Sequence, residues 1–534
     1  MTKYLPLGVA CLFLSLLYSC KSATAPAESS DSDNNSTLGL NAEITIGSLS
    51  KGYANHDYTI KEVVQYYLDR IAAIDDSGPM LNAVLTINPD ALSIAQTLDE
   101  ELAAGKNRGP LHGIPVLLKD NIDTNDKMPC TAGAKCMREN YPTKDSPLAA
   151  QLRAAGAVIL GKSNLSEWAN FHSYQSSSGW SALGGQTKNP YRLTHNPCGS
   201  SAGSGAAVAA NLAPLAIGTE TNGSIICPSN NNGIVGIKPT VGLISRTGII
   251  PISHTQDTGG PMARTVTDAA IALGTLTSAD PADDKTLVPG RQALTDYTPH
   301  LVRDGLKGKR LGYYKLPLAD TEDTALAALM QESIDYCVRA GATVVPVDSI
   351  TPSDINKHAF QVLLYEFKAG VNDYLSREGE KPPVTSLSEI VSLTFADEEE
   401  MKYHDHKLLQ DANAKGDLQS EEYLKAKATA KTQSQEEGVD RVMALHNLDA
   451  IIAPSGSPAW PTSLADGDSY GVFSSSPAAI AGYPNITVPM GLIDGLPVGM
   501  SIFGTAWSEP TLIEIAFGFE QASKKRTTPT FEVE

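Results

Sequence analysis

Residues 109–270 constrain the fold more than any other part of the chain, because short apolar runs alternate there with runs of small residues. The apolar runs have the length of buried strands and lie at 114–118, 157–160, 215–218 and 233–238. Helix-like segments lie among them at 146–156 and 201–212. Strands that alternate with helices in this way predict an α/β layer architecture.

The regions on either side of residues 109–270 have different patterns of apolar residues. A helical pattern of apolar residues covers residues 59–104. The more polar region 280–445 contains a strand-like run at 310–314, a helix at 325–341 and a long helical run at 396–445. Apolar runs typical of buried strands occur again at 449–460 and 486–504. We therefore expect one domain, residues 41–534, with a helical insertion at about 315–445.

The N-terminus has the features of an exported protein. In residues 1–20 a lysine precedes an apolar run of signal-peptide length. The run ends in Leu17-Tyr18-Ser19-Cys20, which resembles the lipobox of bacterial lipoproteins, although Tyr18 is bulkier than the usual residue. Residues 21–40 are polar and predict a flexible tether. We expect a periplasmic or membrane-anchored bacterial lipoprotein, held by lipid at Cys20, with simple secretion or an uncleaved anchor as alternatives.

The charge of the chain excludes one class of partner. The net charge of −19 argues against nucleic acid, because a phosphate-binding surface needs clustered Lys and Arg. No cofactor is expected. The tightest histidine cluster is His404-Asp405-His406, in a stretch expected to be helical, where residues i and i+2 point to different faces. We therefore expect no metal site.

Beyond the targeting segment the chain has five cysteines, an odd number, so at least one thiol stays unpaired. Cys130 and Cys136 are close enough in sequence to bridge in an oxidising compartment. The sequence does not determine the pairing among Cys130, Cys136, Cys198, Cys227 and Cys337.

The stretch GTETNGSIICPS, residues 218–229, contains Ser224 after a glycine, with no histidine within about twenty residues on its C-terminal side. Thr221, Asn222 and Gly223 precede this serine and have few bulky side chains. Backbone N–H groups could therefore converge here, as an oxyanion hole requires. A plain β-turn is the alternative.

Two further serines lie in CGSSAGSG, residues 198–205. The run matches the nucleophile-elbow pattern with Ser201 as nucleophile, but the preceding NPYRLTHNP is polar and contains two prolines, unlike the strand that an elbow needs. Ser200 and Ser201 are also suited to cap the helix that follows. A helix N-terminus supplies free N–H groups, so capping does not exclude chemistry.

Lys119 ends the apolar run in LHGIPVLLKDNID, residues 111–123. A lysine at a strand end often extends to water. If the site closes over Lys119, however, desolvation lowers its pKa and makes the neutral amine available as a base.

Taken together, Lys119, Ser200 and Ser224 occur in an order that resembles the amidase signature family of serine hydrolases. GSSAGSG is followed by VAANLAPLAIGTETNGSI, GIVGIKPTVGLISRTGIIPIS and DTGGPMARTVTDAA, as in that family. The resemblance covers about residues 45–525 and is densest at 109–270. It implies an amidase signature fold, with a large mixed central β-sheet covered by helices on both faces.

The resemblance also implies roles for individual residues. Ser224 is the acyl-accepting serine, Ser200 the cis-peptide serine and Lys119 the base, with Ser201 in support. The backbone N–H groups of Thr221, Asn222, Gly223 and Ser224 form the oxyanion hole. Most members have Asp-x-Gly-Gly-Ser in this loop, whereas this chain has Asn222 in place of the first glycine. Asn tolerates left-handed backbone angles, so the turn can survive.

Within the family, residues 160–201 look most like the peptide amidase branch, which removes the C-terminal amide of peptides. Trp168, Phe171, Tyr174 and Trp180 lie in this segment as candidates for an acyl pocket, or as ordinary core aromatics. The alternatives are an aryl acylamidase or general amidase, and a glutaminase-type tRNA amidotransferase subunit, which the signal peptide and acidic charge oppose. A lipid-tethered binding protein is the non-enzymatic alternative.

Overall fold

The computed structural model describes residues 38–40, 43–319 and 323–533. Leu40–Glu534 cluster into one compact unit. The expected signal peptide, Cys20 and most of the expected tether lie outside the described residues. Among the helices that the structure describes, none has both the length and the apolar character needed to span a membrane.

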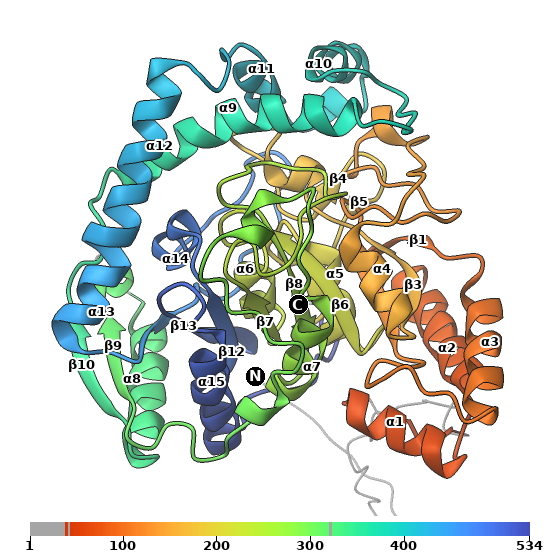
Figure 1. Cartoon of the computed structure of the whole chain (residues 1–534), viewed down its shortest axis with the longest axis horizontal. Helices are drawn as coiled ribbons and strands as arrows, with labels where there is room; N and C mark the ends of the chain where they lie inside the picture. Colours follow the sequence, from red (N-terminus) through yellow and green to blue (C-terminus); the bar gives the residue numbers. More distant parts are fainter. Residues whose placement is uncertain (1–37, 41–42, 320–322, 534) are drawn as a thin grey trace, which may run out of the picture. The chain divides into compact units, whose positions relative to one another are not determined.

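Eleven strands of the described chain form one sheet, in the order β1-β3-β2-β6-β8-β7-β12-β13-β11-β9-β10 (Figure 1). β2 runs parallel to β3 and β6, and β9 runs parallel to β10 and β11, whereas the other neighbouring pairs are antiparallel. The strands are β1 Val84–Ile87, β2 Pro115–Lys119, β3 Val158–Ser163, β6 Leu215–Glu220, β7 Val235–Lys238, β8 Thr258–Ala263, β9 Arg310–Tyr314, β10 Thr343–Val347, β11 Ala450–Pro454, β12 Asn485–Ile493 and β13 Leu496–Phe503. A separate hairpin pairs β4 Trp180–Ser181 with β5 Gly185–Gln186.

The helices of the described chain surround this sheet. They are α1 Ile46–Asn55, α2 Ile60–Arg70, α3 Ala91–Ala103, α4 Pro147–Ala154, α5 Ala202–Ala209, α6 Ile226–Asn231, α7 Val266–Leu276, α8 Thr324–Arg339, α9 Ile355–Leu375, α10 Leu387–Ala396, α11 Lys407–Asn413, α12 Glu421–Ser434, α13 Asp440–His446, α14 Ser476–Ala481 and α15 Glu509–Ser523. Every residue of β2, β3, β6, β7 and β8 is buried, which requires cover on both faces of the sheet. The predicted large mixed sheet with helices is therefore confirmed.

Helix α5 approaches the sheet unusually closely because its residues are small and all buried. A Cβ on Gly203 would lie 2.2 Å from the carbonyl oxygen of Ala83 and 2.5 Å from that of Asn164. Glycine is therefore required at this contact. The close approach holds the helix N-terminus, with Ser200 and Ser201 just before it, against the loops at the edge of the sheet.

Three expected segments differ from the structure. The helical pattern at 59–104 contains an edge strand, β1, which pairs with β3 between α2 and α3. The expected insertion at 315–445 includes β10, which joins the main sheet. The run at 396–445 is not one helix. His406, with a left-handed φ of 47°, precedes α11, residues 414–420 separate α11 from α12, and the segment Gln435–Val439, with a non-helical Gly438, separates α12 from α13.

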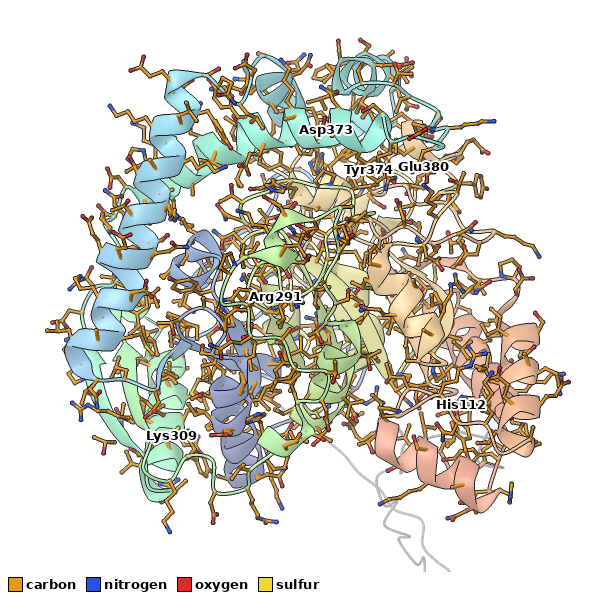
Figure 2. The ribbon with its side chains drawn as sticks, viewed as in Figure 1. His112, Arg291, Lys309, Asp373, Tyr374 and Glu380 are labelled. Atoms are coloured by element: carbon orange, nitrogen blue, oxygen red, sulfur yellow. A yellow bond between two sulfur atoms is a disulfide. The ribbon has the colours of Figure 1, made fainter. Side chains whose placement is uncertain are left out.

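The helical region packs against the side of the sheet that carries the serines. In Figure 1, α9 lies along the top of the view and α12 down its left side. Tyr374, labelled at one end of α9 in Figure 2, donates from its hydroxyl to Asp123 Oδ1 (2.7 Å). Arg377 forms an ion pair with Asp123 Oδ2 (2.8 Å). These contacts attach α9 to the loop that follows Lys119.

Candidate active site

Lys119 lies beside the loop that contains Ser224 because their two strands are neighbours in the sheet. β2 ends at Lys119, and its parallel neighbour β6 ends at Glu220, so both carboxyl ends lie at the same edge of the sheet. The Lys119 side chain is fully buried and does not extend to water. Its Nζ donates to Ser200 Oγ (2.7 Å), Thr219 Oγ1 (2.9 Å) and the Thr219 carbonyl oxygen (3.3 Å).

Burial lowers the pKa of Lys119 from 10.5 to about 7, against the smaller raising effects of Asp257 and Glu220. The charged ammonium is disfavoured because its hydrogen-bond partners are neutral oxygens and no carboxylate among the described residues contacts it. The Lys119 amine is therefore substantially neutral near neutral pH and can accept a proton.

Ser200 connects the lysine to the cavity. The peptide bond between Gly199 and Ser200 is cis. Ser200 is almost fully buried, and its carbonyl oxygen accepts from the backbone N–H of Ser166 (3.0 Å). With Lys119 Nζ on one side and the cavity surface on the other, its hydroxyl is placed to pass a proton between the two.

Ser224 lies in the turn from β6 into α6. Glu220 holds this turn, because its Oε2 accepts from the backbone N–H groups of Ile225 (2.7 Å) and Ile226 (3.0 Å). Gly223 has a φ of 86°, and a Cβ there would lie 2.5 Å from the Phe473 ring. Ser224 is 9% exposed and lines the same cavity as Ser200. The turn therefore presents the Ser224 side chain to the cavity.

Asn222 does not take the left-handed conformation that the sequence interpretation allowed for; Gly223 is the left-handed residue of the loop. The Asn222 side chain instead accepts from Ser475 Oγ (2.6 Å) and donates to Ser476 Oγ (3.1 Å). No acceptor in the described part of the chain takes the N–H groups of Asn222, Gly223 or Ser224. These donors are available to a bound oxygen.

Ser201 is fully buried and is not part of the cavity lining. Its hydroxyl donates to the Thr219 carbonyl oxygen (3.0 Å) and accepts from the Thr219 N–H (3.2 Å). Its own N–H donates to the Ser224 carbonyl oxygen (3.2 Å). Ser201 thus positions the backbone around Lys119 and Ser224, and its hydroxyl is not presented as a nucleophile.

A disulfide joins Cys198, which precedes Ser200 in the sequence, to Cys227, which follows Ser224. Cys198 precedes the cis peptide, and Cys227 lies in α6 just after Ser224. The bridge between Cys130 and Cys136 that their spacing allowed is not formed, and both are free thiols, as is Cys337. Burial raises the pKa of Cys130 well above its ordinary value.

The two serines open into a cavity of about 320 Å³. Its apolar wall is formed by Phe171, Ile252, Leu363, Tyr470 and Phe473. Of the four aromatic residues expected to line an acyl pocket, Phe171 does so. The sequence interpretation missed the other four wall residues, which come from distant segments and carry no local motif.

The remaining three expected aromatics lie elsewhere. Trp168 packs edge-on against Phe367 of α9, with ring centroids 6.3 Å apart. Tyr174 is 53% exposed and donates to Asp411 Oδ2 (2.9 Å). Trp180 is buried and stacks on the ring of His172. None of the three is among the residues that line the cavity.

Comparisons with known proteins show the family to which the chain belongs. The chain matches the family model named Amidase over residues 62–513. A probable amidase of Arabidopsis thaliana is 38% identical over 500 residues, which cover 92% of each chain. A glutamyl-tRNA(Gln) amidotransferase subunit of Alkaliphilus metalliredigens is 32% identical over 489 residues, covering 90% of this chain and 96% of that one.

Among solved structures, the native peptide amidase of Stenotrophomonas maltophilia is 47% identical, with a TM-score of 0.88, and the match covers 92% of this chain and 99% of that one. An amidase family protein of Bacillus anthracis is 34% identical, with a TM-score of 0.84, and covers 94% and 95%. The family match spans most of the chain, and the higher of these identities is to a peptide amidase. The chain therefore belongs to the amidase signature family, in its peptide amidase branch, and is an amide-hydrolysing enzyme.

Proposed function

We propose that this enzyme removes the C-terminal amide of peptides, releasing ammonia, through an acyl-enzyme on Ser224 with Ser200 as proton relay and Lys119 as base. The observation that carries the proposal is the buried contact of 2.7 Å between Lys119 Nζ and Ser200 Oγ. The likeness to a solved peptide amidase supports the substrate class.

In the acylation step, Ser224 Oγ attacks the amide carbonyl carbon. Its proton passes to Ser200 Oγ, whose own proton passes to neutral Lys119. The C–N bond then breaks, and the relay returns a proton to the departing nitrogen, which leaves as ammonia. Each positioned proton transfer contributes ~10²-fold or more.

The negative oxygen of the tetrahedral intermediate needs donors already aimed at it. The N–H groups of Asn222, Gly223 and Ser224, which have no protein acceptor in the described part of the chain, support this role. Water then attacks the acyl-enzyme through the same relay. The peptide acid leaves, and Ser224 regains its proton.

The cavity supports a substrate with an apolar group next to the cleaved amide. Phe171, Ile252 and Leu363 form an apolar wall beside the serines. Burial of an apolar side chain there contributes about 1.5–3 kcal/mol of binding. We expect amides of Leu, Phe or Met to be cleaved faster than those of Asp or Lys.

An ammonia-release assay tests this function. Peptide amides, the same peptides as anilides, and free glutamine are compared at equal concentrations, with Ser224→Ala as the blank. The proposal expects peptide amides to give the highest kcat/KM. Preferential cleavage of anilides would instead identify an aryl acylamidase.

A second candidate is glutamine hydrolysis for a tRNA amidotransferase, because the amidotransferase subunit of Alkaliphilus metalliredigens is 32% identical over 90% of this chain. Cleavage of glutamine alone would establish that function and overturn ours. The net charge of −19 opposes direct binding of tRNA.

We also propose that the chain is exported and held by lipid at Cys20. The Cys198–Cys227 disulfide supports an oxidising compartment. Detergent-phase partitioning of the expressed protein, compared with Cys20→Ala, tests the anchor. Equal partitioning of the two proteins would contradict it.

A further inference from the structure

Glu167, His172 and His406 form a buried cluster that the proposed mechanism does not use. Each offers one ligand atom, and these atoms all lie within 4.8 Å of one another. All three side chains are fully buried. The sequence interpretation considered His406 only with its neighbour His404, whereas the fold brings it to His172, 234 residues away.

We propose that Glu167, His172 and His406 bind a divalent transition-metal ion, with Zn²⁺ as the ion best suited to two imidazoles and one carboxylate. His172 Nδ1 and His406 Nδ1 are 3.3 Å apart. Two ligands at zinc distances and a tetrahedral angle are about 3.4 Å apart. Glu167 Oε1 lies 3.8 Å from His406 Nδ1, and all three ligand atoms lie within 4.8 Å of one another, so the carboxylate needs to shift toward the two imidazoles to complete the site.

The hydrogen bonds around His406 prepare it to be a ligand. Its Nε2 lies 2.9 Å from the carbonyl oxygen of Glu400, which can only accept. Nε2 therefore carries the proton, and Nδ1 of the neutral ring presents a lone pair to the cluster. A backbone carbonyl that holds the far nitrogen in this way is the usual outer partner of a metal-bound histidine.

The cluster also has an unsatisfied acceptor that an ion would satisfy. Glu167 Oε2 accepts from the N–H of Ala182 (2.8 Å), but Oε1 has no hydrogen-bond partner among the described residues. A buried polar atom left without a partner destabilises the folded chain. Glu167 Oε1 faces His406 Nδ1 at 3.8 Å, and His172 Nδ1, 3.3 Å from His406 Nδ1, carries the proton of that contact until a metal ion displaces it.

Glu400 places a second acid beside Glu167. It is buried, its Oε1 accepts from the Lys135 N–H (2.9 Å), and its Oε2 has no partner in the described part of the chain. A cation held by Glu167 is also attracted by the neighbouring carboxyl of Glu400.

The position of the cluster suggests what the ion does. Glu167 and His172 bracket Ala169 to Phe171, which line the cavity, while His406 belongs to the helical region just before α11. Trp168, Ala169 and Asn170 have left-handed φ values of 49°, 54° and 71°. These backbone angles are disfavoured for residues other than glycine, and least so for asparagine. A metal ion bound to the cluster would link this strained segment of the cavity wall to the helical region.

The test is metal binding by the full-length chain, purified without a histidine tag, stripped with EDTA and desalted. CoCl₂ is added, the protein is desalted again, and bound cobalt is measured by mass spectrometry and by the visible absorption of the Co²⁺ ion. We expect one tightly bound Co²⁺ per chain. His406→Gln and Glu167→Gln should each weaken binding by at least about tenfold.

His112→Gln is the matched control, because His112 is also a buried histidine with both ring nitrogens engaged. Figure 2 shows it at the lower right, far from Tyr374 at the top. It should bind cobalt as the wild type does. Circular dichroism checks that each variant is folded.

Binding to the wild-type chain needs no variant for its interpretation. If the stripped wild type takes up no Co²⁺ or Zn²⁺, the cluster is a hydrogen-bonded network and the proposal is overturned. Equal uptake by wild type, His406→Gln and Glu167→Gln would overturn it as well. A melting temperature that Zn²⁺ raises in the wild type but not in folded Glu167→Gln would support it.

Discussion

Lys119 Nζ lies 2.7 Å from Ser200 Oγ inside the protein, with no carboxylate in contact with the amine. The two residues are 81 positions apart in sequence. Parallel pairing of β2 with β6 and the close packing of α5 bring them together. In the proposed mechanism, Lys119 takes the role of the base that histidine has in many serine hydrolases.

Lys119→Met should reduce kcat/KM by ~10⁴-fold or more, because the relay loses its terminal base. Rates are measured by ammonia release, and added base at high pH should not restore them. Lys238→Met is the matched control: Lys238 is also a fully buried lysine at a strand end, but it donates to the Tyr483 carbonyl oxygen (2.7 Å). The Lys238→Met variant should be less stable than the wild type, but its folded form should still hydrolyse the substrate through the relay. Equal activity of Lys119→Met and wild type would exclude Lys119 as the base.

The pH profile of kcat/KM should show an acid limb with an apparent pKa near 7, the value to which burial lowers that of Lys119. Below it the amine is protonated and cannot accept a proton, so the rate falls about tenfold per pH unit; above it the rate is flat. Asp257 raises the pKa of Lys119 by its charge, so Asp257→Asn should move the limb to lower pH. A limb that stays in place, or moves upward, would show that another group is titrating.

Ser224→Ala and Ser201→Ala should differ in kind. The first removes the attacking oxygen and should abolish turnover while leaving stability nearly unchanged. The second removes two buried hydrogen bonds to Thr219 and should cost about 1–3 kcal/mol of unfolding free energy, with only part of the activity lost. Urea unfolding and ammonia release separate the two effects. If Ser201→Ala alone were inactive, the nucleophile assignment would be wrong.

Replacing both Cys198 and Cys227 with serine should lower stability by about 2–4 kcal/mol, because the bridge closes a loop across 29 positions. Activity should also fall, since the bridge spans both serines. Cys337→Ser, at a buried free cysteine, is the control for loss of a sulfur without loss of a cross-link. A double variant as stable as Cys337→Ser would show that the bridge contributes nothing.

Gly223→Ala should reduce kcat strongly, by ~10²-fold or more, because the added Cβ meets Phe473 at 2.5 Å and the φ of 86° disfavours alanine. Asn222→Ala should be milder. It removes the side-chain bonds to Ser475 and Ser476 but keeps the backbone N–H. Comparable losses in both variants would indicate that the Asn222 side chain acts on the substrate directly.

Local patterns predicted much of the fold. The strand at 114–118 and the helix at 201–212 appear as β2 and α5, within one to three residues at their ends. Buried runs and small-residue helices depend on neighbours along the chain, which the sequence displays. An edge strand between two helices makes a weak pattern, so β1 could not be predicted in this way. The long helical run predicted at 396–445 was wrong as one continuous helix, because a left-handed His406, the segment 414–420 and a non-helical Gly438 interrupt it.

What the sequence determined by itself was the order of Lys119, Ser200 and Ser224 and the α/β layers that hold them, since both rest on local motifs. Only the tertiary structure decided which distant side chains meet. It paired Cys198 with Cys227, placed Leu363 of α9 in the cavity wall, moved Trp168 and Trp180 out of it, and brought His406 to Glu167 and His172. Such contacts depend on how helices pack against the sheet, and the free energy of that packing comes from many residues that are far apart in the sequence. A short stretch of sequence therefore cannot predict them.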